Sequence, residues 1–330
     1  MGNGFSTHGR LPSGPESIRI PVRIVTPPRR RVKLPLLLFL LTIVSTLTVG
    51  AHLTRAFEQN QYPYTEYFSW LDLFGPVIEN PFSLLSGWPF ALALMGILLA
   101  HELGHYFACR IYGIHATYPY FLPAPTLIGT MGAFIRIQSP IVHRRALFDV
   151  GIAGPLVGFA VAVPALIVGI LYSKAIPGTL AQGAIVFGNP PLVELLAKLL
   201  RPDVPLDQLF LHPIGRAAWV GLFATALNLL PVGQLDGGHI LYAVAPSRHR
   251  SLSRLFIFLL FVIGLFGLLY PETIWFGWTF WGILLRLMGT RHPTVLEPVQ
   301  TLNRKRLWVA ALGLLVFLLC FTPVPFHLYY

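Results

Sequence analysis

The chain has 330 residues, of which 55% are hydrophobic and 11% are charged, with 24 Lys and Arg against 13 Asp and Glu. This composition and a mean hydropathy of +0.66 exclude an ordinary soluble enzyme and indicate a polytopic membrane protein. The net charge of +11 does not indicate nucleic-acid binding, because no basic run is interleaved with aromatic residues that stack on bases.

The first 33 residues are rich in Pro, Gly, Ser and Arg and have no apolar periodicity. We expect residues 1–33 to form a disordered basic cytosolic tail. Residues 34–82 then contain a first membrane span and an aromatic outer loop. Residues 246–330 contain three further apolar runs and are expected to form a C-terminal membrane region.

Seven apolar runs have about the length that a bilayer core requires. They are residues 34–53, 89–111, 147–172, 216–230, 255–270, 273–288 and 307–321. We therefore expect an all-α polytopic membrane protein with about seven transmembrane helices. A cytosolic N-terminus and an outside C-terminus would leave only five Lys and Arg residues on the outer side, as the positive-inside rule favours. The cell (inner) membrane is the expected location.

The second run contains the sequence His101-Glu102-Leu103-Gly104-His105. On a helix, His101 and His105 lie on one face and can bind the same metal ion. Zinc suits such ligands, and Glu102 would then serve as the base that takes a proton from water. Chance occurrence is the alternative, but ionisable groups inside an uncharged apolar run are costly unless they are used.

Residues 112–145 are too polar and too rich in Pro and Gly to span a membrane, and residues 129–138 alternate as a strand does. We expect a small β-hairpin or re-entrant loop near the metal site, with a free edge that could bind an extended peptide. An ordinary interfacial loop is the alternative.

Asp149 lies near the start of the third run, and its expected partner is Arg145, four residues earlier on the same helix. Gly151, Gly154 and Gly158 follow. Their spacing predicts close packing against another helix, such as the one that carries Gly104.

A third metal ligand is expected from Asp236, which lies in a break rich in Pro and Gly after the fourth run. A capping or turn role is the alternative for Asp236. Asn228, two turns before Asp236, could donate to a substrate or to an oxyanion, or could only bond between helices. Gln234 and His239 are given no ligand role, because two His and one carboxylate complete a catalytic zinc site.

Two motifs together resemble the site-2 protease family of intramembrane zinc metalloproteases. They are His101-Glu102-x-x-His105 and Asn228-x-x-Pro231-x-x-x-Leu235-Asp236-Gly237. The similarity covers about residues 83–245, which would form the catalytic core. It is greatest to the plant-type and bacterial branch, and neither outer loop has room for the PDZ module that some members carry.

The resemblance implies hydrolysis of a membrane-anchored protein substrate near its cytosolic end, with membrane lipid as the surroundings. It implies that His101, His105 and Asp236 bind one Zn²⁺, that Glu102 is the general base and that Asn228 is catalytic. A strand at Ala133, Phe134 and Ile135, extending to Ile137, would bind the substrate. Two other functions stay open at this point, namely an intramembrane metal transporter and a catalytically silent membrane scaffold of the same fold.

Overall fold

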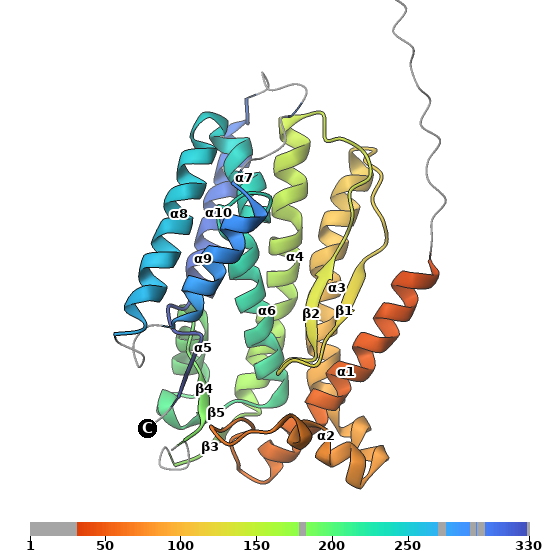
Figure 1. The fold of residues 1–330 in the computed structure, drawn as a ribbon, viewed down its shortest axis with the longest axis vertical. Helices are drawn as coiled ribbons and strands as arrows, with labels where there is room; N and C mark the ends of the chain where they lie inside the picture. The colour runs from red at the N-terminus through yellow and green to blue at the C-terminus, as the bar shows by residue number, and fades with distance from the viewer. Residues whose placement is uncertain (1–31, 178–182, 270–274, 291–294, 296–300, 329–330) are drawn as a thin grey trace, which may run out of the picture. The chain divides into compact units, whose positions relative to one another are not determined.

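The computed structural model describes residues 32–177, 183–269, 275–290, 295 and 301–328. The chain divides into two units, Met1–Arg30 and Arg31–Tyr330. The first unit, and with it nearly all of the predicted tail at residues 1–33, lies outside the described residues. The second unit consists mostly of helices, and Figure 1 shows α4 between α3 and α6.

Helices dominate the second unit. They are α1 (Lys33–Glu58), α2 (Trp70–Glu79), α3 (Trp88–Ile111), α4 (Arg144–Leu171), α5 (Pro191–Leu200), α6 (Pro213–Leu229), α7 (Asp236–Val244), α8 (Pro246–Phe266), α9 (Gly277–Met288) and α10 (Arg304–Cys320), with 3₁₀ turns at Pro81–Gly87 and Leu206–Gln208. Each of the seven predicted runs coincides with a helix over most of its described length. The expectation of a helical membrane protein is confirmed.

Helix length does not support the predicted number of seven spans. Four helical segments of the described chain are long and apolar enough to cross a membrane: Lys33–Glu58, Pro81–Ile111, Arg144–Leu171 and Pro246–Phe266. The other three runs form α6, α9 and α10, which have 17, 12 and 17 residues. Proline contributes to the shortening of α6, because Pro231 follows its end and Pro213 is its first residue.

Local sequence explains where the site-bearing helices begin and end. Pro89 lies in the first turn of α3, where its missing N–H costs nothing. Gly113, just beyond α3, has a φ of +66°, a conformation that ends helices and that glycine adopts without strain. Between α6 and α7, Gly233 has a φ of +56° and turns the chain back toward α3.

The predicted hairpin is present. Strand β1 (Tyr120–Pro123) pairs antiparallel with β2 (Thr130–Phe134), with Phe121 opposite Ala133. The connecting turn is held at the middle of α1, where Ser45 donates from Oγ to the Gly129 carbonyl at 2.6 Å. The Tyr64 hydroxyl, from the segment that follows α1, donates to the Leu127 carbonyl at 2.6 Å. The turn of the hairpin is therefore anchored to α1 and to the segment that follows α1.

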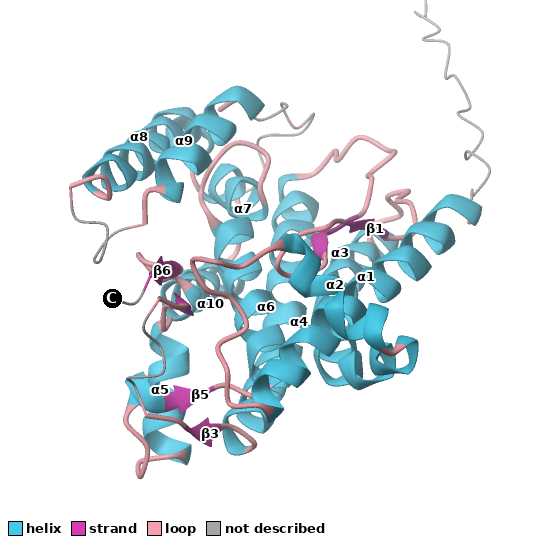
Figure 2. Ribbon diagram, turned by 60° about the horizontal axis from the view of Figure 1, so that its bottom comes forward, coloured by secondary structure: helices cyan, strands magenta, loops and turns pink. Residues whose placement is uncertain are grey.

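Two further small sheets were not expected from the sequence. Strand β3 (Lys174–Ala175) pairs with β5 (Leu209–Phe210), and β4 (Ile185–Phe187) pairs with β6 (Phe326–Leu328). An isolated bridge joins Thr65 to Ala184. Strands of two or three residues have too little pattern to be recognised in a sequence, but they gather three distant loop segments at one end of the helices (Figures 1 and 2).

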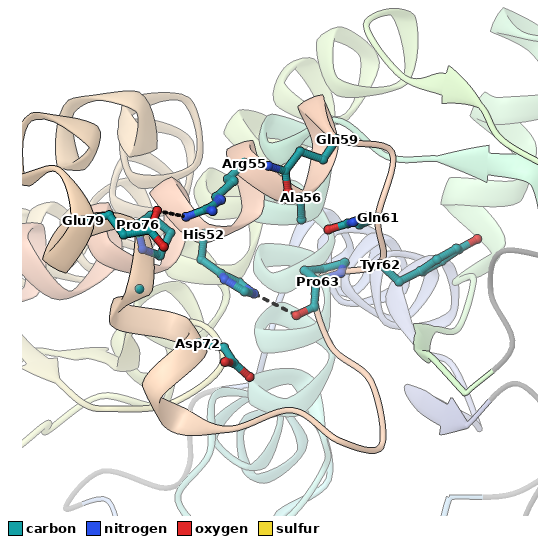
Figure 3. Close-up of a pocket in the computed structure, with 11 residues that line it drawn as sticks. His52, Arg55, Ala56, Gln59, Gln61, Tyr62, Pro63, Asp72, Pro76 and Glu79 are labelled. Atoms are coloured by element: carbon teal, nitrogen blue, oxygen red, sulfur yellow. Dashed lines mark hydrogen bonds and ion pairs between the residues drawn. The ribbon is translucent and has the colours of Figure 1, made fainter.

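A polar cavity of about 260 Å³ lies between the end of α1 and α2 (Figure 3). Arg55 of α1 donates to Glu79 of α2 at 2.7 Å, and the His52 Nε2 lies 2.7 Å from the Pro63 carbonyl oxygen. Ser69 and Asp72 cap the start of α2 reciprocally. These contacts hold α2 against the end of α1.

The core lies around α4, which contacts α3, α6, α7 and α10. The prediction that small residues bring α3 and α4 together is confirmed, since a Cβ on Gly104 would lie 2.7 Å from the Ala153 carbonyl oxygen. Gly169 of α4 and Gly215 of α6 meet in the same way farther along α4, where a Cβ on Gly169 would lie 2.2 Å from the Gly215 Cα. Close packing of this kind fixes the helix that faces the two histidines.

Candidate active site

Three predicted ligands meet between α3 and α7. His101 and His105 lie one turn apart on α3, and Asp236 is the first residue of α7. The Asp236 Oδ2 is 3.2 Å from the His101 Nε2 and 3.3 Å from the His105 Nε2, and the two Nε2 atoms are 3.1 Å apart. Among the described residues, these three form the single cluster with metal-ligand geometry.

The arrangement of hydrogens at this cluster fits a bound cation. The His105 Nδ1 lies 2.8 Å from the Val150 carbonyl oxygen, which can only accept, so Nδ1 carries a proton. In the neutral ring, the His105 Nε2 then presents a lone pair to the Asp236 carboxylate and to the His101 Nε2. Ligand atoms around a tetrahedral ion at about 2.0–2.1 Å would be about 3.3 Å apart, close to the observed separations.

Glycines of α4 make room for the two histidine rings. A Cβ on Gly154 would lie 2.1 Å from the His105 Nε2, and a Cβ on Gly158 would lie 3.1 Å from the His101 Cβ. The rings of His101 and His105 therefore occupy space that the side chain of any residue larger than glycine at positions 154 and 158 would fill. The glycine spacing was interpreted from the sequence as helix packing alone, and its role in admitting the rings was missed.

Glu102 is buried, lies beside both histidines and contributes none of the three ligand atoms. It lines the same cavity, of about 230 Å³, as His101, His105 and Asp236. The backbone amide of Ile135, just after β2, faces the Glu102 carboxylate. A carboxylate next to the metal ligands, and facing the cavity, is placed to exchange a proton with a molecule held there.

Asn228 lies in the last turn of α6 and reaches the same site. Its Nδ2 is 3.3 Å from the His101 Nε2, and its side chain lines the cavity. The contact with His101 is a bond between α6 and α3, and it also brings the Asn228 amide to the cluster, where it can donate to a ligand in the cavity. Both interpretations from the sequence are therefore compatible with the position of Asn228.

The predicted substrate-binding residues Ala133, Phe134 and Ile135 also line this cavity. Gln234 and His239, which were given no ligand role, line it too and are not members of the metal-ligand cluster. Residues that were predicted from four separate segments of the sequence therefore line one cavity. The prediction did not include Val150, whose carbonyl orients His105.

The expected pairing of Asp149 with Arg145 is wrong. Asp149 accepts from Arg306 of α10, with Nε–Oδ1 at 2.9 Å and Nη2–Oδ2 at 2.6 Å, and also from the Tyr112 hydroxyl. Burial, and then the hydrogen bond to Asp149, raises the pKa of Tyr112, so its hydroxyl stays protonated. Asp149 directly precedes Val150, and so α10 is bonded to the turn of α4 that orients His105. Arg306 is 157 residues from Asp149 in the sequence, so the residues near Asp149 do not indicate this partner.

Replacing Arg306 by Gln is expected to lower the free energy of unfolding by about 1.5–3 kcal/mol, because a charge-assisted bond with two contacts is lost at a partly buried site. Denaturant titration in micelles measures the change. The matched control is Glu194→Gln, which breaks the exposed Glu194–Lys198 pair at 3.8 Å and should cost less than about 0.5 kcal/mol. Equal effects of the two substitutions would contradict this prediction.

Comparison with protein families matches residues 89–270 of the chain to Peptidase family M50. This match covers more than half of the chain and includes all three ligands, Glu102 and Asn228. The chain belongs to Peptidase family M50.

Curated relatives agree with the M50 assignment. The chain is 32% identical over 218 residues to the probable zinc metalloprotease EGY1, chloroplastic, of Oryza sativa subsp. japonica, covering 62% of this chain and 36% of that protein. It is 34% identical over 223 residues to the protein of the same name from Arabidopsis thaliana, covering 62% and 38%. It is 36% identical over 180 residues to the probable zinc metalloprotease EGY2, chloroplastic, of Oryza sativa subsp. indica, covering 54% and 33%. The matches thus span about a third of each relative's length.

Proposed function

We propose that this M50 chain is a zinc-dependent metalloendopeptidase that hydrolyses a peptide bond in or near the transmembrane segment of a membrane-anchored protein. The observation that carries the proposal is the meeting of His101, His105 and Asp236 within 4.8 Å, on the wall of a cavity that Glu102 also lines. The names of the relatives, which describe them as probable zinc metalloproteases, support zinc as the ion. One Zn²⁺ would be held by the two Nε2 atoms and the Asp236 carboxylate.

Bound zinc would supply Lewis-acid chemistry, making a carbonyl more electrophilic and water more acidic. The residues of the chain supply the rest. Glu102 takes a proton from the attacking water and returns it to the leaving amine. Asn228 donates from Nδ2 to the oxygen on which negative charge develops during attack. Val150 holds the His105 ring in the tautomer that leaves Nε2 free to bind the ion.

The site is proposed to lie within the membrane, close to the cytosolic face. His105 precedes Arg110 by five residues on α3, and so it lies on the order of 10 Å from the basic end of that helix.

Seven crossings with an outside C-terminus remain part of the proposal. The pairing of β4 with β6 supports the outside C-terminus, because it joins the loop before α5 to the segment after α10, and both belong to the outer side in this topology. The relatives are named chloroplastic, whereas the sequence favoured an inner cell membrane, and the proposal commits to a membrane only.

A substrate segment would bind in an extended form along β2. Among the described strands, β2 pairs with β1 alone, which leaves its other edge free. Ala133 and Phe134 of β2, and Ile135 after it, line the cavity that contains Glu102. A free edge can hydrogen-bond to an added strand, and a helical substrate must unwind before its scissile carbonyl is accessible.

Helix-weakening substitutions in a substrate are therefore expected to speed its cleavage. In a single-span reporter, two Leu→Gly substitutions beside the scissile bond should raise kcat/KM by up to about thirtyfold, because each Gly disfavours a helix by about 1 kcal/mol. Two Leu→Gly substitutions at the opposite end of the span are the control and should have little effect. If both reporters are cut at the rate of the unsubstituted one, binding in an extended form is contradicted.

The experiment that tests the proposed function is cleavage of a tagged single-span reporter in proteoliposomes. The samples are the native chain, the native chain with a zinc chelator, and Glu102→Gln. Cleavage that is lost in both of the latter supports the metalloprotease. Zinc flux across the vesicle without cleavage would support a transporter instead, and bound zinc with neither activity would support a silent scaffold; either result would overturn the proposal.

A further inference from the structure

Helices α8 and α9 form an antiparallel pair with a groove on its surface. Gly282 of α9 allows close approach, since a Cβ there would lie 3.2 Å from the Phe261 backbone nitrogen of α8. Beside this contact is a cavity of about 410 Å³, lined by residues of α8 and α9 only. Figures 1 and 2 both show the two helices side by side. The groove is separate from the cavity of the metal ligands.

The floor of the groove is apolar, and its side chains have the spacing of residues on one face of a helix. Phe258 and Phe261 lie three residues apart on one face of α8, and Ile283 and Leu287 lie four residues apart on α9. These side chains are 38–79% exposed. In water such a surface would be unfavourable, but in a membrane it is the surface that acyl chains contact.

One end of the groove carries two arginines. Arg254 comes before Phe258 and Phe261 on α8, whereas Arg286 is near the last residue of α9. Because the helices are antiparallel, the two guanidinium groups lie at the same end. Both side chains are exposed, and the described residues offer neither of them a hydrogen bond or an ion pair. In contrast, Arg144 and Arg306 are engaged in bonds within the chain.

We infer that this groove binds one anionic phospholipid, with its phosphate between Arg254 and Arg286 and an acyl chain along Phe258, Phe261 and Ile283. Charge complementarity carries the choice of occupant. Two guanidinium groups that have no partner among the described residues, at the mouth of an apolar groove, match a ligand with an anionic head and an apolar tail. Under the proposed topology, both arginines belong to the cytosolic side, where anionic lipids bind basic residues most strongly.

Native mass spectrometry of the detergent-purified full chain tests this inference with phosphatidylglycerol and phosphatidylcholine as the two probes. The native chain should retain phosphatidylglycerol in preference to phosphatidylcholine. The double variant Arg254→Gln, Arg286→Gln should bind phosphatidylglycerol roughly ten- to thirty-fold more weakly, with phosphatidylcholine unchanged. The control Arg304→Gln, Lys305→Gln removes the same charge from exposed residues of α10 outside the groove and should bind as the native chain does.

A third variant tests the contribution of the apolar groove separately from that of the two arginines. Ile283→Trp fills the groove and keeps both arginines, and it should also weaken phosphatidylglycerol binding. Excess glycerol phosphate, which has the head chemistry without acyl chains, should not displace the lipid. Unchanged binding in the double variant, equal loss in the control, or displacement by glycerol phosphate would overturn the inference. So would a dimer of the native chain that the double variant loses, because the occupant would then be a second copy. None of these readouts depends on peptide hydrolysis.

Discussion

Glu102→Gln is expected to lower the rate of reporter cleavage by about 10²–10⁴-fold while one zinc ion per chain stays bound. Glutamine has nearly the same size as glutamate but cannot accept a proton at neutral pH. Because the ligand atoms come from His101, His105 and Asp236, the substitution leaves the metal ligands in place. Cleavage in proteoliposomes gives the rate, and elemental analysis of the purified variant gives the zinc content.

The control for Glu102→Gln is Glu194→Gln, which makes the same chemical change at a half-exposed position of α5. Its cleavage rate should equal that of the native chain. The assignment of Glu102 as the base is contradicted if Glu102→Gln retains the native rate. It is equally contradicted if zinc is lost with the activity, because Glu102 would then be a ligand or a support for one.

Gly154→Ala is expected to weaken zinc binding by at least about 10–100-fold, the range found when groups that orient a ligand are lost. The new Cβ would lie 2.1 Å from the His105 Nε2, closer than any real contact, and the atom it displaces is itself a proposed ligand. The ring must therefore move away from Asp236 and His101. Competition with a chelator of known affinity measures the change.

Gly169→Ala is the matched control for Gly154→Ala. It lies on the same helix, and its Cβ would lie 2.2 Å from the Gly215 Cα, so it perturbs packing at least as severely. Both variants are expected to cost about 1–3 kcal/mol of stability through overpacking, but only Gly154→Ala should lose zinc affinity. Native zinc affinity in Gly154→Ala would contradict the observed position of His105.

The sequence predicted those parts of the fold that depend on local pattern. Apolar runs located α1, α3, α4, α6, α8, α9 and α10 but not α2, α5 or α7, and alternation at residues 129–138 located β2, because burial imposes a period on side chains. The fourth run ended within one residue of the end of α6 at Leu229, but the sequence did not predict that a new helix, α7, begins at Asp236. The short pairs β3–β5 and β4–β6 were missed, since strands of two or three residues are determined by tertiary position rather than by their own sequence.

At the site, the residues that could be predicted were those with ionisable side chains, whose burial within an apolar segment costs free energy. His101, His105 and Asp236 could be identified because ionisable groups need a reason to be buried, and the structure brings them together. The Val150 carbonyl could not be identified, because a backbone acceptor is present at every residue. The partner of Asp149 was predicted wrongly, since Arg145 was near in sequence while Arg306 is near in space.

X-ray absorption spectroscopy at the zinc edge of the purified, zinc-loaded chain tests most directly whether His101, His105 and Asp236 form the metal centre. The zinc ion is expected to have only nitrogen and oxygen neighbours at about 2.0–2.2 Å, with the outer-shell scattering of two imidazole rings. In His105→Ala, that scattering should fall to one ring or the zinc should be lost. A sulfur neighbour at about 2.3 Å, or a native spectrum in His105→Ala, would contradict zinc binding by His101, His105 and Asp236.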